Sequence, residues 1–288
     1  MNSSASPLIL SAAWRDYELL DSGDGRKLER FGRTTIIRGE TKAWWKPDAP
    51  SLWSGADAVL RDDGRWELRK GAARSWTMDF AGVKIQARIS DGSKHLGVFP
   101  EQEPHWSWMM ERLKGQDKPR LLNLFGYTGV ASLAAARAGA QVTHVDASKP
   151  SIAWGRDNQA ASGMGEAPIR WVLEDALKYV GREIKRGSRY EAILLDPPSF
   201  GRGPKGEVWK VEEQVVELLG ECRKLLSDKP LLIILTMYNL EASSLMLANL
   251  LSDTLSGLGG ELRTGELALK HSRSEKLLPL SLFARWSA

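Results

Sequence analysis

The sequence predicts an α/β fold in which a doubly wound, largely parallel sheet follows a smaller strand-rich region. Three observations support this prediction. From about residue 120 onward, short apolar runs alternate with longer segments of helical periodicity. Glycines or acidic residues directly follow several of these runs. Eight of the twelve tryptophans lie before residue 119, so the N-terminal part is expected to have a different architecture.

The N-terminal region has the period-two patterns of β-strands. Pro7 to Ala13 is a short apolar segment without a preceding positive charge, and we interpret it as a pairing or packing segment rather than a signal sequence. Residues 65–69 alternate, and residues 76–89 alternate on both sides of Ala81-Gly82, as in a hairpin. We expect a strand-rich domain over residues 1–98 and a second domain over residues 99–288.

Basic and aromatic residues are interleaved between positions 26 and 46. The basic residues are Arg26, Lys27, Arg30, Arg33, Arg38, Lys42 and Lys46, against Glu29 and Glu40, with Phe31, Trp44 and Trp45 between them. Such a segment can hold backbone phosphates and stack bases. It can equally be a solvated face above a small tryptophan core. The net charge of +4 is small for 288 residues and does not distinguish an RNA-binding segment from a solvated face.

The remainder of the chain predicts a seven-stranded mixed sheet. A helix from Pro104 to about Lys114 comes first. The expected strands cover residues 120–124, 141–146, 169–173, 193–195 and 231–236, and 261–269 with 278–286 as an antiparallel closing pair. The expected helices cover residues 130–138, a segment beginning near 150, 176–185, 208–226 and 241–255.

Polar groups follow the first three strands of this sheet. The first strand runs into the loop Gly126-x-x-Gly129, the second ends in Asp146, and the third is followed by Asp175. Glycines let a ligand approach the backbone, and an acid after the second strand suits the hydroxyls of a ribose. The loop has too few glycines to cradle a pyrophosphate. The sequence therefore favours a nucleoside ligand without phosphates.

Asp196-Pro197-Pro198-Ser199-Phe200 follows the buried run of the fourth strand. The carboxylate can accept a hydrogen bond from a planar amino group, while Phe200 can stack on the ring that carries it. The alternative is an ordinary Pro-Pro turn at the end of a strand.

These motifs together resemble the class I S-adenosylmethionine-dependent methyltransferases, and specifically the bacterial large-subunit ribosomal RNA methyltransferases of the I and K types. The resemblance covers roughly residues 75–288. It rests on Asn-Leu-Phe-Gly-Tyr-Thr-Gly at 123–129, Asp146-Ala147-Ser148, Asp157-Asn158, Asp175-Ala176 and Asp-Pro-Pro-Ser-Phe at 196–200. It implies a Rossmann-like, seven-stranded methyltransferase sheet.

The resemblance also implies roles for individual residues. The expected contacts to S-adenosylmethionine come from Asn123, Phe125, Gly126, Tyr127, Thr128, Gly129, Asp146, Ala147, Ser148, Asn158, Asp175, Ala176 and Asp196. Phe125 to Gly129 would wrap the methionine part, Asp146 would hold the ribose and Asp175 would meet the adenine amino group. Asp196, Pro197 and Phe200 are the expected catalytic residues. The expected partner is RNA, with ribosomal RNA as the substrate.

Three of these residues have structural alternatives. Asn123 replaces the acid that usually opens the glycine loop, and it could cap or cross-link a loop. Asp175 could be the N-cap of the following helix. Asp146 could cap the helix near residue 150, although Ser148 suits that position better. The segment 201–206 could be a mobile lid or only a flexible connection.

The expected chemistry is direct methyl transfer to an amino nitrogen. Carbon methylation of cytosine needs a cysteine thiolate, and Cys222, the only cysteine, lies inside a predicted helix. Acceptors on a protein or a small metabolite remain alternatives. Four scattered histidines do not suggest a metal site, and no apolar run is long enough to span a membrane. With no disulfide possible, we expect a cytoplasmic protein. The oligomeric state stays open.

Overall fold

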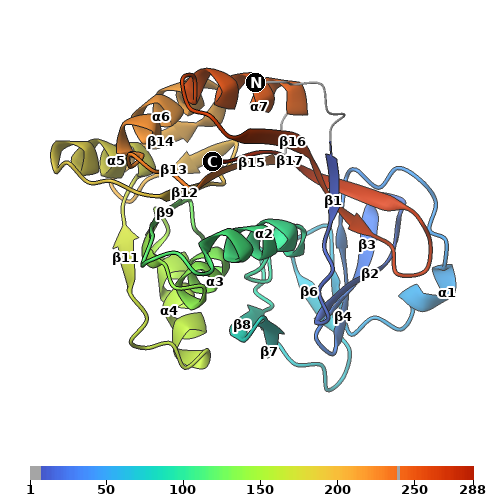
Figure 1. The fold of residues 1–288 in the computed structure, drawn as a ribbon. Coiled ribbons are helices and arrows are strands. Elements are labelled where there is room, and N and C mark those ends of the chain that lie inside the picture. Colours follow the sequence, from blue (N-terminus) through green and yellow to red (C-terminus); the bar gives the residue numbers. More distant parts are fainter. Residues whose placement is uncertain (1–7, 239–240) are drawn as a thin grey trace.

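The computed structural model describes residues 8–238 and 241–288. Figure 1 shows a large sheet with helices on both faces and a group of N-terminal strands (blue) at one side. The predicted α/β architecture is thus confirmed.

The central sheet has eight strands in the order β1-β16-β17-β15-β12-β9-β10-β11. In that order their bounds are Leu8–Ser11, Glu261–Lys270, Leu277–Ser287, Leu232–Tyr238, Ala192–Leu195, Arg120–Leu124, Gln141–Asp146 and Ile169–Leu173. The strands from β15 to β11 are parallel, whereas β17 is antiparallel to both of its neighbours. Seven strands match the prediction. The eighth, β1, pairs with β16 and comes from the N-terminal segment that was expected to pair or pack; Pro7 lies outside the described residues.

Helices cover both faces of this sheet. Figure 1 shows α5, α6 and α7 over one face and α2, α3 and α4 (green) over the other. These helices span Glu103–Leu113 (α2), Val130–Arg137 (α3), Lys149–Ala161 (α4), Ala176–Lys185 (α5), Val211–Leu225 (α6) and Ser244–Thr254 (α7), and η1 at Pro100–Gln102 leads into α2. α6 buries Val211, Val215, Leu218, Cys222 and Leu225 at helical spacing. The doubly wound arrangement leaves the carboxyl ends of the parallel strands at one edge.

Two helices begin three residues later than the sequence predicted, α7 at Ser244 instead of residue 241 and α6 at Val211 instead of residue 208. Residues 208–210 form strand β14 (Val208–Lys210), which pairs antiparallel with β13 (Phe200–Arg202). The backbone groups of residues 208–210 form hydrogen bonds with β13, so they are not available for an additional turn of α6. The predicted lid at 201–206 is therefore largely the turn of this hairpin.

The N-terminal region is strand-rich, as expected. A five-stranded sheet is formed by β2 (Tyr17–Gly23), β3 (Arg26–Phe31), β4 (Thr34–Gly39), β5 (Ala58–Leu60) and β6 (Trp66–Leu68), with the short α1 (Pro50–Trp53) before β5. The predicted hairpin is β7 (Ser75–Phe80) and β8 (Val83–Arg88). Its turn residues Ala81 and Gly82 both have positive φ.

The hydrophobic core is continuous across residue 98. The ring of Trp14 packs edge-on against Phe80 and Trp106, whose own centroids are 5.2 Å apart. These rings belong to the N-terminal region, β7 and α2, and they join one buried cluster. The division into domains at residue 98 stays a prediction, and the two parts share a packed interface.

The predicted basic surface is internal at two of its seven basic residues, Lys27 and Arg38, which corrects the interpretation of residues 26–46 at these positions. Lys27 and Arg38 are buried and pair with Glu29, which is also buried and accepts from the Tyr17 hydroxyl. Arg30 pairs with Glu18. A buried cation cannot meet RNA phosphate from outside. Strands β2, β3 and β4 thus contain a buried ion-pair cluster that a linear charge pattern cannot reveal.

The β16–β17 hairpin (red) reaches from the large sheet to the N-terminal strands (Figure 1). At its end, His271 Nε2 lies 2.7 Å from Ser22 Oγ, and the His271, Asp21 and Asp48 side chains come within 4.8 Å of one another. The Asp21 carboxylate already accepts from Ala49 N, Trp53 Nε1 and two further backbone amides. The Asp21 oxygens that would have to coordinate a cation are already occupied by these hydrogen bonds. We therefore interpret this cluster as a hydrogen-bonded joint between the hairpin and the N-terminal sheet.

We predict that Glu29→Gln destabilises the protein by about 3–5 kcal/mol, because Arg38 is left buried without its counter-charge. Burial alone would raise the pKa of Glu29, but Arg38 and Lys27 offset this and lower it from 4.5 to about 2. A depressed carboxylate pKa gives stability that is present above pH 4.5 and is lost as the pH falls through about 2. Urea unfolding at several pH values measures both effects.

The half-exposed Arg30–Glu18 pair supplies the control for that experiment. Glu18→Gln should cost no more than about 1 kcal/mol, since exposed ion pairs contribute little. Equal destabilisation by the two variants would contradict the role of the buried cluster.

Candidate active site

The glycine loop between β9 and α3 has an unusual backbone. Phe125 and Tyr127 have φ of 57° and 52°, and Gly129 has φ of 77°. Positive φ is costly for residues with a Cβ, so the surrounding structure must hold this loop. Tyr127 N donates to Asp146 Oδ2 at 2.8 Å, and Gly126 N donates to Val145 O. The end of β10 therefore fixes the loop that follows β9.

Two glycines are required here because the loop lies directly on side chains of β10 and β11. A Cβ on Gly126 would come within 2.3 Å of His144 Cε1, and one on Gly129 within 2.5 Å of Trp171. The loop backbone can therefore approach the sheet, and any ligand above it, only without side chains at these positions.

Asp146 is the acid at the end of β10, and its carboxylate lies against the loop. It accepts from Tyr127 N and from Ser148 N, both at 2.8 Å. Burial raises the pKa of Asp146, although these two hydrogen bonds oppose the rise. The N-cap of α4 is Ser148, which accepts from Ser151 N. Asp146 is thus released from capping, as its position next to a ligand would require.

Asn123 lies under the loop and cross-links it. Its Nδ2 donates to Ser132 Oγ at 2.9 Å, and Ser132 Oγ lies 2.9 Å from His144 Nδ1. Burial lowers the pKa of His144 to about 3, so this imidazole is neutral. The cross-linking alternative for Asn123 agrees with these bonds, and the side chain also lines a cavity.

Two cavities flank the loop, and Phe125 lines both. The Asp196 cavity, of about 70 Å³, is lined by Phe99, Gln102, Asn123, Tyr127, Asp196 and Thr236 among others. The Asp146 cavity, of about 170 Å³, is lined by Asp146, Ala147, Ser148, Asp175, Ala176 and Trp209 among others. Most of the predicted ligand-binding residues thus gather at one edge of the sheet.

Asp175 has the capping role that was considered for it, and its contact with the adenine amino group stays a prediction. Its side chain accepts from Lys178 N at 3.0 Å and caps α5. It also lines the Asp146 cavity, next to Ala176. The cap fixes the orientation of a carboxylate at the wall of that cavity.

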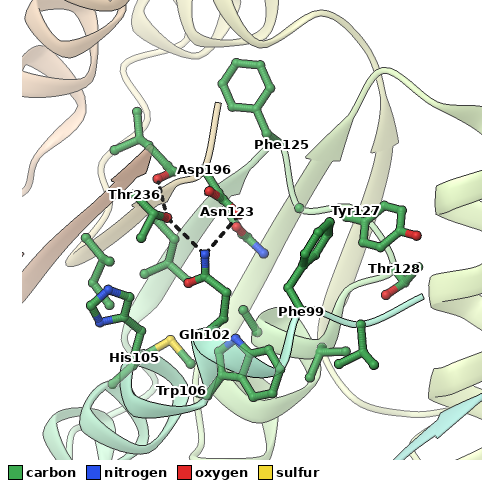
Figure 2. Close-up of a pocket in the computed structure, with 18 residues that line it drawn as sticks. Phe99, Gln102, His105, Trp106, Asn123, Phe125, Tyr127, Thr128, Asp196 and Thr236 are labelled. Atoms are coloured by element: carbon green, nitrogen blue, oxygen red, sulfur yellow. Dashed lines mark hydrogen bonds between the residues drawn. The ribbon is translucent and has the colours of Figure 1, made fainter. Parts of the chain in front are cut away.

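Asp196 follows β12 and reaches the first cavity (Figure 2). Gln102 Nε2 lies 3.2 Å from Asp196 Oδ2 and 3.4 Å from Thr236 Oγ1. Oδ1 is buried and has no hydrogen-bond partner among the described residues. Burial raises the pKa of Asp196 to about 7, and the nearby charge of Glu101 adds to the rise. An acceptor atom is therefore held at the cavity without a donor.

Four predicted site residues line neither cavity: Gly129, Asn158, Pro197 and Phe200. Asn158 is fully buried, donates to Thr128 O at 3.0 Å and accepts from Gln86 N at 2.8 Å, so it braces the loop from behind. Phe200 is 54% exposed at the start of β13, with the Arg202 guanidinium 5.9 Å from its ring. Pro197 is buried. The expected direct ligand contact of Asn158 is thereby corrected, because its amide is already engaged.

The sequence reasoning missed several cavity residues. Phe99 and Gln102 belong to residues 97–102, which resemble the family's loop that crosses from the N-terminal sheet to the cofactor cleft, but neither residue was assigned to the site. Trp209 lies in β14, donates to Pro198 O at 2.7 Å and has its ring 4.9 Å from that of Phe125. Assigning residue 208 onward to a helix hid this contact.

The model of the S-adenosylmethionine-dependent methyltransferases matches residues 56–228. The chain belongs to this family. A solved S-adenosylmethionine-dependent methyltransferase from Agrobacterium tumefaciens is 44% identical, with a TM-score of 0.94 over 98% of this chain and 94% of the other.

Curated relatives of this methyltransferase include ribosomal RNA large subunit methyltransferases K/L. The protein from Shewanella baltica (strain OS155) is 39% identical over 150 residues, and that from Shewanella frigidimarina is 33% identical over 148 residues. Each match covers 51% of this chain and 20% of the relative, so the chain corresponds to about a fifth of their length.

The methyltransferase site fits the family's cofactor. Gly126 and Gly129 leave the loop backbone bare, Asp146 is a buried carboxylate beside it, and the cavities on both sides share Phe125. These are acceptors and open backbone suited to a ribose and an amino-acid chain. None of the described helices has the length and apolar character of a membrane span.

We predict that Gly126→Ala weakens S-adenosylmethionine binding by roughly tenfold or more, which corresponds to about 1.4 kcal/mol. The added Cβ would meet His144 at 2.3 Å, so the loop would have to shift. Isothermal titration calorimetry measures the affinity. Gly181→Ala in α5, where a Cβ meets nothing within 4 Å, is the matched control. If both variants bind like the original protein, the loop does not form the cofactor site.

Proposed function

We propose that this methyltransferase transfers a methyl group directly to an exocyclic amino nitrogen of a base in ribosomal RNA. The observation that carries the proposal is the buried, unpartnered Oδ1 of Asp196 at the cavity wall. A buried acceptor without a donor costs free energy, and an amino N–H of the substrate would satisfy it.

The cofactor side of the proposal assigns residues by their position. Asp146 would hold the ribose hydroxyls, the backbone of Phe125 to Gly129 the methionine part, and the wall formed by Asp175 and Ala176 the adenine. When bound, S-adenosylmethionine supplies an electrophilic methyl group. Asn158 supports the loop from behind and acts as a positioning residue.

The acceptor side depends on Asp196. Its Oδ1 would accept a hydrogen bond from the amino group and direct the nitrogen lone pair into the cavity, with the Pro197 carbonyl as a second acceptor. The methylated nitrogen must lose a proton, and a carboxylate with a pKa of about 7 can take it up near neutral pH. Alignment of this kind can lower a barrier by roughly 7–11 kcal/mol. The exposed ring of Phe200 would contact RNA at the surface.

Direct transfer to nitrogen is favoured over carbon methylation by the position of Cys222. The thiol is 1% exposed on the inner face of α6, and burial raises its pKa. It lines neither of the two cavities. A thiol that is buried and protonated is a packing residue rather than a nucleophile.

The RNA substrate is supported by the names of the curated relatives, which are ribosomal RNA methyltransferases. The matched segment is only a fifth of those proteins, so the substrate needs its own test. An enzyme with this substrate would work in the cytoplasm.

The decisive experiment supplies labelled S-adenosylmethionine to the enzyme together with separated ribosomal RNA, protein and metabolite fractions. We expect label in the RNA, released by nuclease digestion as an N-methylated nucleoside. Label confined to protein or to small molecules would overturn the RNA assignment, and a carbon-methylated nucleoside would overturn the proposed chemistry.

A second prediction separates the two acids. Asp196→Asn should reduce turnover by about 10²-fold or more while cofactor affinity stays nearly unchanged. Asp146→Asn should instead weaken cofactor binding by about 1.5–3 kcal/mol, because a charged acceptor is lost. Rates and calorimetric affinities are measured on both.

The pH profile supplies the internal check. Asp196 can accept the proton only when it is ionised, so the rate should fall as the pH drops through about 7. This decrease at low pH should be absent in Asp196→Asn and present in Asp146→Asn. A limb that is unchanged in Asp196→Asn would exclude the proposed proton acceptor.

A further inference from the structure

A third cavity lies where the N-terminal sheet meets the active site. We call it the Lys94 cavity; its volume is about 200 Å³. Its walls include Lys27, Arg38, Lys42, Lys94, Glu101 and Tyr238. The first three come from the N-terminal sheet or the loop after β4, and Tyr238 ends β15. Both parts of the chain therefore build it.

The Lys94 cavity adjoins the Asp196 cavity. Phe99 lines both, and its ring lies 6.2 Å from that of Tyr238. Tyr238 follows Thr236 by two positions on β15, and residues two apart in a strand share a face. Burial and then the Asp196 charge raise the pKa of Tyr238 to about 12, which agrees with this proximity. Asp196 therefore lies next to the wall that the two cavities share.

Positive charge dominates the walls of the Lys94 cavity. Four cations, Lys27, Arg38, Lys42 and Lys94, face two acids, Glu40 and Glu101. Lys27 pairs with Glu40 and Glu29, and Lys42 Nζ donates to Leu280 O at 2.5 Å. The exposed ammonium of Lys94 has no hydrogen-bond or ion-pair partner among the residues that the structure describes. This cation is available to an anion from outside.

The inner wall offers rings and an unpartnered polar atom. The His95 and Phe99 rings lie 5.0 Å apart, and Nδ1 of His95 is buried without a partner in the described chain. Glu101 is 9% exposed, and the nearby charges of Lys27 and Arg38 oppose the rise in its pKa that burial causes. Buried polar atoms are normally satisfied, so Nδ1 of His95 suits a planar ligand with its own hydrogen-bonding groups.

The rim carries an exposed aromatic ring. Trp44 is 88% exposed, and its Nε1 donates to the carbonyl of Thr41 at 2.7 Å. Thr41 and Lys42 line the cavity, so the indole stands close to its entrance. An exposed tryptophan held by a hydrogen bond is a suitable surface for stacking a base.

We infer that the Lys94 cavity receives the nucleotide to be methylated: its base enters along Phe99 and Tyr238 toward Asp196, its phosphate meets Lys94, and a neighbouring base stacks on Trp44. The inference rests on the proposed function, since it takes RNA as the acceptor. Asp196 lies at a buried wall, so the target base must leave the stack to reach it. The N-terminal part thus contributes directly to substrate binding through Lys94 and Trp44, whereas the buried cluster around Glu29 supports the wall.

The test uses charge reversal of Lys94. Lys94→Glu should weaken binding of a fluorescein-labelled, single-stranded RNA of mixed sequence by roughly tenfold, measured by anisotropy without cofactor. The slope of log affinity against log salt should fall by about 0.7, the value for one phosphate contact on a single strand. Trp44→Ala should also weaken binding but leave the slope unchanged, because stacking releases no counterion.

The matched control is Lys229→Glu. Lys229 is exposed and precedes β15, at the end of that strand remote from Tyr238. The Lys229→Glu variant has the same change in net charge as Lys94→Glu. Its RNA affinity and the salt dependence of that affinity should stay close to those of the original protein. Calorimetry with S-adenosylmethionine should give the same affinity for both variants, which verifies that the cofactor site is intact.

The outcomes separate the inference from the proposed function. If ribosomal RNA takes up label but Lys94→Glu binds RNA like Lys229→Glu, the inference is wrong and the proposed function stands. If both charge reversals weaken binding equally, only bulk charge matters and the inference is also wrong. If label enters protein or metabolites instead of RNA, the proposed function fails and the inference fails with it.

Discussion

The close contact between the glycine loop and the sheet is the constraint on which the rest of the active site depends. Gly126 and Gly129 lie against His144 and Trp171, so the loop backbone packs directly on the sheet. The positive φ of Phe125 and Tyr127 is tolerated because Asp146 accepts from Tyr127 N. Each cavity beside the loop takes its shape from this arrangement. A shift of the loop would alter both cavities together, since Phe125 lines both.

The two parts of the chain are coupled through this same loop. Asn158 bonds to Thr128 O in the loop and to Gln86 N in β8, so one side chain joins the N-terminal hairpin to the cofactor side. The rings of Trp14 and Trp106 extend the shared core, and the His271 joint holds the far end of the β16–β17 hairpin. The N-terminal sheet is therefore held in a fixed position at the mouth of the active site.

Two buried carboxylates give the site its chemical character at a cost in stability. Asp196 and Glu101 are both desolvated, and burial raises the pKa of each. An unsatisfied buried acceptor costs about 1–3 kcal/mol, which the hydrophobic core must offset. The buried Glu29 shows the opposite solution, because Arg38 and Lys27 compensate its charge. Glu29, which forms ion pairs with Arg38 and Lys27, stabilises the fold, whereas Oδ1 of Asp196, which has no partner among the described residues, remains available to a substrate.

The sequence by itself determined seven strands of the large sheet, the β7–β8 hairpin, most helices and the acids at the strand ends. Period-two and helical patterns, glycines and strand-ending acids are local features, so Gly126, Asp146 and Asp196 could be identified from their neighbours in the chain. Only the tertiary structure decided how polar side chains pair. Lys27 and Arg38 looked like a surface for RNA but are buried against Glu29, and Asn158 braces the loop instead of facing the ligand. Phe99, Glu101 and Tyr238 were not assigned to the site and meet only in the fold. The physical reason is that partners distant in sequence determine burial, charge compensation and cavity walls, whereas local backbone preference determines the elements.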